Sequence, residues 1–276
     1  MFLSPFAVIG QRTLDTLEGS GRFVRFMLAG LGAVFSRSAG FGRMRLLIPQ
    51  LYEVGTRSIP VVMLVGGFVG AVLGVEMFDQ MASIGQETRI GGIINLSVVK
   101  QIGPVLAAVM IAGRVGGAVS AEIGTMRVTE QLDALRVMGT DPIRHLVVPR
   151  VLACVIMVPI LTIASDLMGI VGGWLVVVVG FNVDASAYWQ FSADFVTGFD
   201  VLTGLVKAAT FGFLIGLVSC YKGFHCQPGA AGVGKAATDA FVASFIAIII
   251  ANFFLAKFMN ELYTLLYGGG INALSV

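Results

Sequence analysis

The chain has 276 residues, of which 57% are hydrophobic and only 12% are charged, and its mean hydropathy is +0.90. A soluble domain of this length needs far more charge to cover its surface, so this composition excludes an ordinary soluble protein. The net charge of +2 comes without a long basic tract that would suggest nucleic acid, and three cysteines supply no disulfide framework.

Residues 1–45 form the first distinct region, in which phenylalanines and leucines are interspersed with arginines. The arginines are Arg12, Arg22, Arg25, Arg37, Arg43 and Arg45. A stretch of this kind lies in the membrane interface more readily than it crosses the bilayer. We therefore predict an N-terminal amphipathic region over 1–45 and a transmembrane permease domain over 46–276. The first residues show no basic leader, so we expect no cleaved signal peptide.

Five apolar stretches follow, and each has about the 20 residues that a helix needs to cross a bilayer. They cover roughly 58–82, 95–119, 147–180, 203–222 and 238–260. Their long unbroken runs differ from the short alternating segments of a β-barrel. The predicted fold class is an all-α integral membrane protein, with an N-terminal interfacial helix, about five transmembrane helices and a cytoplasmic coupling helix.

The third stretch is too long for a simple crossing, because 147–180 as one helix would measure about 50 Å against a core of about 30 Å. It must tilt, protrude into the cytoplasm or break near Pro159. Basic residues cluster before the first span and in 121–150, whereas 181–202 has three aspartates and no lysine or arginine. This pattern predicts a cytoplasmic N-terminus and an external C-terminus.

Small residues repeat every four positions on two of the spans. The two ladders are Gly66, Gly70 and Gly74 on the first, and Gly204, Ala208, Gly212 and Gly216 on the fourth. Small residues on one helix face permit close helix crossing. Packing within one subunit is the simpler interpretation, and a dimer contact or a lipid-lined groove is the alternative.

The segment 121–150, between the second and third spans, is far more polar than its surroundings. Its apolar and charged residues follow a helical period, and Gly139 is a natural helix stop. Asp141 and Pro142 can serve as the N-cap and the first residue of the next helix. We predict one amphipathic helix over about 122–138 on the cytoplasmic surface, either a solvated connection or a docking helix for a soluble partner.

The run GPVLAAVMIAGRVGGAVSAEIGTMRVTEQLDALRVMGTDPIRHLVVPRVLA, from Gly103 to Ala153, resembles the signature region of the MlaE/YrbE-type permease family. LYEVG at 51–55 and QPGAAGVGKAAT at 227–238 match in the expected order. The resemblance covers roughly residues 45–260. It implies the permease subunit of an ABC transporter in the inner, cytoplasmic membrane, which moves phospholipids or related lipids between that membrane and an MCE-domain protein.

The resemblance also implies the partners. Two permease copies pair with two cytoplasmic ATPase subunits, which bind ATP and Mg²⁺, and with MCE-domain proteins on the other side of the membrane; a small STAS-domain subunit is a further candidate. This chain itself is expected to bind no cofactor, metal or nucleic acid and to have no catalytic residue. The residues assigned to ATPase coupling are Glu122, Gly124, Thr125, Met126, Arg127, Glu130, Gln131, Leu135, Met138 and Asp141.

The lipid cavity is expected between the two copies, lined largely by the first and fifth spans. The lipid-binding candidates are Glu53, Gly70, Gly74, Met77, Lys100 and Gln101. The sequence departs from the family here. Where members such as the enterobacterial protein often carry Arg-Glu before the second span, this chain has Lys100 and Gln101. The basic residue that could meet a phosphate is kept and the carboxylate is lost, which leaves the lipid class open.

Three weaker sequence patterns suggest nucleotide binding, metal binding or a functional acid within a span. Gly229 to Lys235 resembles a P-loop, but Ala236 replaces the hydroxyl that would bind Mg²⁺ and no strand precedes it. The set Cys220, His225 and Cys226 is a weak metal pattern. Asp166, an acid within a span, is either functional or a carboxyl hydrogen-bonded to Ser165, Thr162 or a neighbouring helix.

Two other classes of function compete with the lipid permease. A secondary transporter or channel for an amphiphilic solute would need a polar relay inside the spans, and Asp166 is the acid that lies deep in one. An intramembrane enzyme would need a catalytic constellation, but both histidines, His145 and His225, fall near predicted cytoplasmic loops. We further expect Arg114 to snorkel or to pair with Glu122.

Overall fold

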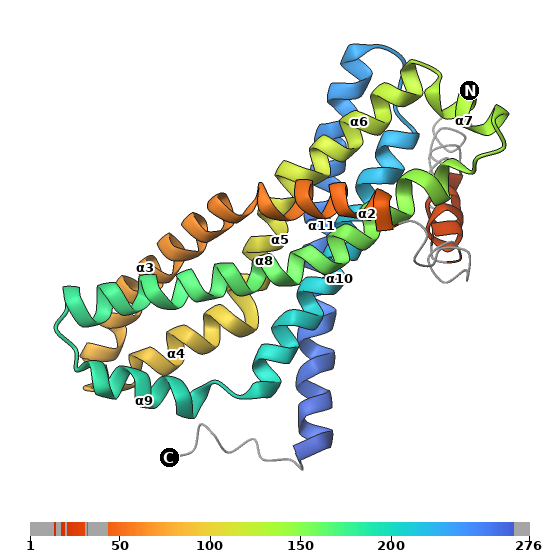
Figure 1. Cartoon of the computed structure of the whole chain (residues 1–276). Helices are drawn as coiled ribbons and strands as arrows, with labels where there is room; N and C mark the ends of the chain where they lie inside the picture. The colour runs from red at the N-terminus through yellow and green to blue at the C-terminus, as the bar shows by residue number, and fades with distance from the viewer. Residues whose placement is uncertain (1–13, 15–17, 20, 31, 33–43, 268–276) are drawn as a thin grey trace, which may run out of the picture.

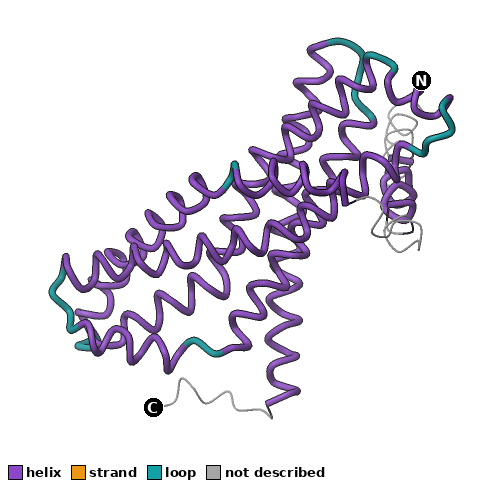
Figure 2. Tube along the Cα trace, viewed as in Figure 1, coloured by secondary structure: helices purple, strands orange, loops and turns teal. Residues whose placement is uncertain are grey.

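The computed structural model describes residues 14, 18–19, 21–30, 32 and 44–267, and this part of the chain is helical, without strands (Figures 1 and 2). The elements, in chain order, are α2 (Met44–Leu51), η3 (Tyr52–Thr56), α3 (Ile59–Ser83), η4 (Glu87–Arg89), α4 (Ile90–Ser97), η5 (Val98–Ile102), α5 (Gly103–Ile111), η6 (Ala112–Gly116), α6 (Gly117–Val128), α7 (Gln131–Val137), η7 (Ile143–Val147), α8 (Val148–Trp174), η8 (Leu175–Gly180), α9 (Ala185–Phe195), α10 (Gly198–Phe224) and α11 (Ala230–Tyr267).

Five helical runs in the described part are long and apolar enough to cross a membrane. They are Arg45–Ser83, Glu87–Val128, Ile143–Gly180, Gly198–Phe224 and Ala230–Leu266. The prediction of an all-α integral membrane protein with five spans is confirmed, although the helices extend well beyond the predicted limits. The amphipathic region over 1–45 lies mostly outside the described residues; the residues described there, of which 21–30 form the longest run, are helical.

Helices α3 and α8 lie side by side over most of their length, and glycine makes this possible (Figure 1). A Cβ atom on Gly70 would lie 1.9 Å from the carbonyl oxygen of Gly169, and one on Gly172 would lie 2.0 Å from that of Gly67. Such close backbone approach leaves no room for any larger residue. The fourth-span ladder does the same against α8, where a Cβ on Gly212 would lie 2.4 Å from the Cys154 carbonyl. Both ladders therefore pack within one subunit.

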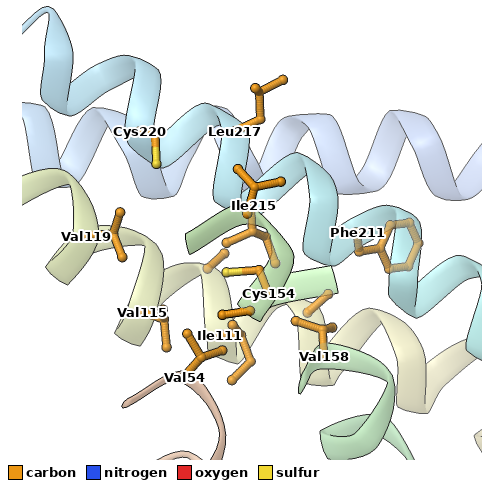
Figure 3. Close-up of a cluster of buried hydrophobic side chains, with 14 of the residues drawn as sticks. Val54, Ile111, Val115, Val119, Cys154, Val158, Phe211, Ile215, Leu217 and Cys220 are labelled. Carbon is orange, nitrogen blue, oxygen red and sulfur yellow. The ribbon is translucent and has the colours of Figure 1, made fainter. Parts of the chain in front are cut away.

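The main hydrophobic core lies where α5, α6, α8 and α10 meet (Figure 3). Its buried members include Ile111, Val119, Cys154, Phe211 and Ile215. A smaller core, formed by α4, η8 and α9, lies towards the opposite end of the bundle. We call the end that carries α6, α7 and the α10–α11 loop the α7 end, and the end that carries η4 and α9 the α9 end.

The third span does not break at Pro159. Helical residues continue from Ile143 to Gly180, and Pro159 lies inside α8. Of the three alternatives, a break near the proline is excluded, so tilt or protrusion must accommodate the length. The π-helical segments η5 and η6 interrupt the second span internally, whereas those of the third span, η7 and η8, lie at its two ends.

Helix α9 is fixed to the second span by a buried polar network. The Tyr188 hydroxyl donates to Asn95 Oδ1 at 3.2 Å, and Asn95 Nδ2 donates to Ser192 Oγ at 2.7 Å. Burial raises the pKa of Tyr188 to about 12, so its hydroxyl stays protonated and available as a donor. Asp184 caps α9 through the Ala187 amide at 3.0 Å, and hydrogen bonds from Ser186 and this amide lower its pKa.

Candidate functional site

A group of polar side chains gathers where η5 meets α10. We call Lys100, Gln101, Asp200 and Lys207 the membrane polar cluster. Lys100 Nζ lies 3.0 Å from Asp200 Oδ1, and Lys207 Nζ donates to the Gln101 Oε1 at 2.5 Å and to the Lys100 carbonyl oxygen at 3.2 Å. The cluster contains two cationic side chains and one carboxylate, so its fully ionised form keeps one positive charge.

Local structure places each member of the cluster. The capping box of α10 holds Asp200, whose Oδ2 accepts from the Thr197 hydroxyl at 2.6 Å and from the Thr197 amide at 3.1 Å. Gly204 lets α10 approach η5 closely, since a Cβ there would lie 2.4 Å from the Val99 carbonyl. The π-helical turn of η5 carries Lys100 and Gln101 beside it.

Lys207 is a member of the cluster that was not predicted from the sequence. Its side chain is 1% exposed, and no ion pair involves it among the described residues. A lysine in the middle of an apolar run is itself a signal, because an ammonium group within a membrane is costly and tends to mark function. The same reasoning that marks the acid Asp166 in the third span as a functional candidate applies to this lysine of the fourth span.

Asp166 lies close to the cluster's second-span segment but not within hydrogen-bond reach of a partner. Its Oδ1 is buried without a hydrogen bond among the described residues, and a Cβ on Gly103 would lie 1.7 Å from it. Thr162 donates instead to the Val158 carbonyl at 2.9 Å. The expected hydrogen bonds from Ser165 or Thr162 to this oxygen are therefore not formed.

The remaining lipid-binding candidates do not gather at one place. Gly70 and Gly74 are buried against α8 and its continuation, so they line no cavity in this subunit. Met77 packs on the smaller core, and Glu53 is exposed and pairs with Arg57 at 3.0 Å. Only Lys100 and Gln101, of the six predicted residues, lie together.

The segment predicted as one helix over 122–138 consists of two, and that prediction is wrong. Helix α6, which continues the second span, ends at Val128, and α7 begins at Gln131. Glu130 between them adopts a left-handed conformation with φ of 59°, which breaks the helix. The predicted stop at Gly139, with φ of 73°, and the cap by Asp141, which accepts from the Ile143 amide at 3.0 Å, are confirmed.

The predicted coupling residues divide into buried and exposed groups. Gly124 is buried, and Met126 packs against the main core. The exposed residues are spread over the last turns of α6, the α6–α7 turn, α7 and the loop that follows it; they are Glu122, Thr125, Arg127, Glu130, Gln131, Met138 and Asp141. Leu135, on α7, is half-buried. Exposed Val137 and Met138 give this end an apolar contact surface.

Ion pairs tie the α7 end to the membrane spans. Arg150 is almost fully buried and its Nη2 lies 2.8 Å from Glu122 Oε1. Arg114 donates to the Ser58 hydroxyl, and it lines, with Glu53 and Glu122, a cavity of about 620 Å³. The expected pairing of Arg114 with Glu122 is not formed, because Glu122 is used by Arg150.

The α10–α11 loop does not form a metal centre in the described part of the chain, where no group of three or more potential ligands comes together. Cys220 is buried inside α10, whereas His225 and Cys226 follow the helix. Burial raises the pKa of the Cys226 thiol. A Cβ on Gly232 would lie 2.1 Å from the Gln227 carbonyl, so this glycine packs the loop against the first turn of α11.

Five spanning helices with a polar cluster among them define a multi-pass α-helical membrane protein. The sequence profile of the family described as Permease MlaE matches residues 47–258. A probable ABC transporter permease protein of Rickettsia bellii is 40% identical over 257 residues, which cover 93% of this chain and 98% of the relative. The intermembrane phospholipid transport system permease protein MlaE of Haemophilus influenzae is 33% identical over 260 residues, which cover 94% and 98%.

A probable ABC transporter permease protein of Synechocystis sp. is 43% identical over 217 residues, which cover 79% of this chain and 82% of the relative. The chain belongs to the MlaE permease family. This confirms the resemblance seen in the sequence.

Proposed function

We propose that the chain is the membrane subunit of an ATP-driven transporter that moves phospholipid between the inner membrane and an MCE-domain protein. The observation that carries the proposal is the end-to-end match to a relative named as a phospholipid transport permease. The membrane polar cluster supports it, because a site with a residual positive charge suits an anionic headgroup. Lys100, with 34% of its side chain exposed, is the member that would meet the phosphate.

The α7 end is the proposed docking site for the ATPase and faces the cytoplasm. Arg127, Arg136 and Arg144 lie there, with Lys222 and Lys235 of the neighbouring helix ends. This enrichment in basic residues is typical of the cytoplasmic side. ATP and Mg²⁺ would bind to the partner, with a STAS-domain subunit as a further partner on the same side.

A second copy of the chain completes the proposed assembly. Most of the apolar surface of α11 is uncovered in the single chain, and α3 carries exposed Leu64, Phe68 and Val72. Five spans cannot easily enclose a two-tailed lipid, and pairing across these faces would build the cavity between two copies.

The test is to purify the tagged chain from its native membranes and reconstitute the complex in vesicles that contain a labelled phospholipid. We expect an ABC ATPase and an MCE-domain protein to co-purify, and lipid transfer to depend on ATP hydrolysis. Transport without an ATPase that follows an ion gradient would overturn the proposal in favour of a secondary transporter, for which buried Asp166 and Lys207 would be the candidate relay.

The docking site is tested by changing the α6–α7 turn. Glu130→Lys combined with Leu135→Asp should detach or uncouple the ATPase while the permease stays in the membrane. Glu87→Lys, an exposed change at the α9 end, is the control. Normal ATPase co-purification and full transport in the double variant would contradict this assignment.

A further inference from the structure

A second basic site lies outside the membrane polar cluster, at the α7 end. A cavity of about 420 Å³ opens between the C-terminal end of α10 and the first turns of α11. Its polar lining residues are the cationic Arg22, Lys222 and Lys235, the acid Asp239, and His225. None of these residues belongs to the predicted coupling or lipid-binding sets.

The cavity has more positive than negative charge. Lys222 Nζ lies 4.0 Å from Asp239 Oδ2, at the limit of an ion pair, and this is the one carboxylate that lines the cavity. Arg22 and Lys235 form no ion pair with any residue that the structure describes. Two cationic groups thus converge on a cavity without a counter-charge of their own, which suits a phosphate or carboxylate ligand.

Aromatic contacts hold the N-terminal helical residues against this cavity. The ring of Tyr221 lies edge-on to Phe23 at 5.1 Å and to Phe26 at 5.5 Å between centroids. Because Arg22 is adjacent to Phe23, this packing places its guanidinium at the cavity rather than leaving it on a detached segment. The first turn of α11 contributes the positive end of a helix dipole on the other side.

The position of the cavity along the spans decides between ligand classes. It lies where one spanning helix, Gly198–Phe224, ends and the next, Ala230–Leu266, begins. Ends of spanning helices lie near the level of lipid headgroups, and basic pockets between helices at this level bind anionic headgroups. A nucleotide is a poor fit, because Ala236 follows Lys235 and no strand leads into the loop.

We propose that this pocket binds the phosphate group of an anionic phospholipid from the surrounding leaflet. The lipid is a resident one that fixes the N-terminal helical residues to the α10–α11 loop, and its binding does not depend on the transport function proposed above. Phosphate also occurs as a free anion and in nucleotides, so the test has to separate these sources.

The experiment uses the full chain in nanodiscs of phosphatidylcholine with or without phosphatidylglycerol. Cys226 lines the pocket and serves as the reporter, since Cys154 and Cys220 are buried. We expect phosphatidylglycerol to slow maleimide labelling of Cys226, and native mass spectrometry to show retained phosphatidylglycerol. Arg22→Gln with Lys235→Gln should remove the protection and weaken retention by about tenfold or more.

Two further variants make the result decisive. Lys257→Gln, on the same helix but at the α9 end, removes a positive charge away from the pocket and should behave as wild type. Arg22→Lys with Lys235→Arg keeps both charges and should retain the lipid. Equal retention by the charge-removal variant and wild type overturns the site. Equal protection by inorganic phosphate or ATP in phosphatidylcholine discs overturns the lipid as its ligand.

Discussion

The third and fifth spans are alike in length and apolar character, yet their surroundings differ. The third has 38 residues and the fifth 37, but 56% of the most apolar stretch is buried in the third and only 11% in the fifth. The third span lies between α3 and α10, whereas α11 packs along one side of the bundle (Figure 1).

Side-chain size accounts for this difference. Helix α8 presents Gly169 and Gly172 to α3, and the two backbones come into contact. Helix α11 presents Phe245, Ile249 and Phe253, which remain exposed in the single chain. Hydropathy therefore identifies a spanning helix, but the placement of small residues identifies the neighbour against which it packs. The uncovered face of α11 is left for lipid or for a second copy.

The largest expected effect on stability comes from a leucine-to-alanine change on the third span, compared with the same type of change on the fifth. Leu161→Ala on α8 removes a side chain with 0% exposure and should destabilise the protein by roughly 2–5 kcal/mol, because a cavity remains. Leu266→Ala on α11, where the side chain is 65% exposed, should cost less than about 0.5 kcal/mol. Thermal unfolding in detergent measures both. Equal losses would show that α11 is buried in the solubilised protein.

The glycine contacts give the next largest effect. Gly70→Ala places a Cβ 1.9 Å from the Gly169 carbonyl and should destabilise the protein by about 1–3 kcal/mol. The matched change on α11, Gly234→Ala, meets no atom within 4 Å and should stabilise the helix by about 0.5–1 kcal/mol. The same unfolding assay applies. A neutral Gly70→Ala would mean that α3 and α8 separate without cost.

Lipid retention tests whether the membrane polar cluster, on the buried side of the bundle, binds a headgroup. Lys100→Ala removes the cation next to Asp200 and should reduce co-purified lipid by about tenfold, equivalent to about 1.4 kcal/mol. Lys100→Arg keeps the charge and should retain most of the lipid. Mass spectrometry of bound lipid provides the measurement. Wild-type lipid and transport in both variants would make Lys100 an interfacial anchor only.

The smallest effect on stability, and a clear effect on assembly, is expected at Phe253. Phe253→Cys replaces an exposed side chain of α11 and should form a disulfide between two copies in native membranes under mild oxidation. The matched control is Ile163→Cys, on the exposed side of α8. Non-reducing gels measure the product. A crosslink at Ile163 but not at Phe253 would place the contact between copies on the third span.

Local sequence patterns predicted what depends on local physics. The five spans, the Gly139 stop and the Asp141 cap follow from apolar length and backbone preference, and the structure confirms them. Contacts between helices were harder to predict from the sequence. The single helix over 122–138 fails because Glu130 adopts a conformation that its residue type rarely favours. Gly70 and Gly74 fit a cavity lining and a helix contact equally well, and only the position of α8 decides between them.

The polar cluster illustrates the same limit. Lys100 and Gln101 could be proposed from their place just before Gly103 and Pro104, but their partners come from α10, about a hundred residues later. The sequence shows Lys207 as a charged residue in an apolar run, but it does not show that Gln101 and the Lys100 carbonyl accept its hydrogen bonds. A side-chain pair between two helices depends on which helix faces contact each other, and the sequence periodicity within one helix does not predict that contact.

The continuous helix α8 lies beside a second span that is interrupted by π-helical turns. Helix α8, Val148–Trp174, runs through Pro159 without interruption, and at 1.5 Å per residue its 27 residues extend about 40 Å. The second span is divided by the π-helical turns η5 and η6, where backbone hydrogen bonding changes register. The second span can therefore bend at η5, the turn that carries Lys100, whereas α8 contains no such π-helical turn between its ends.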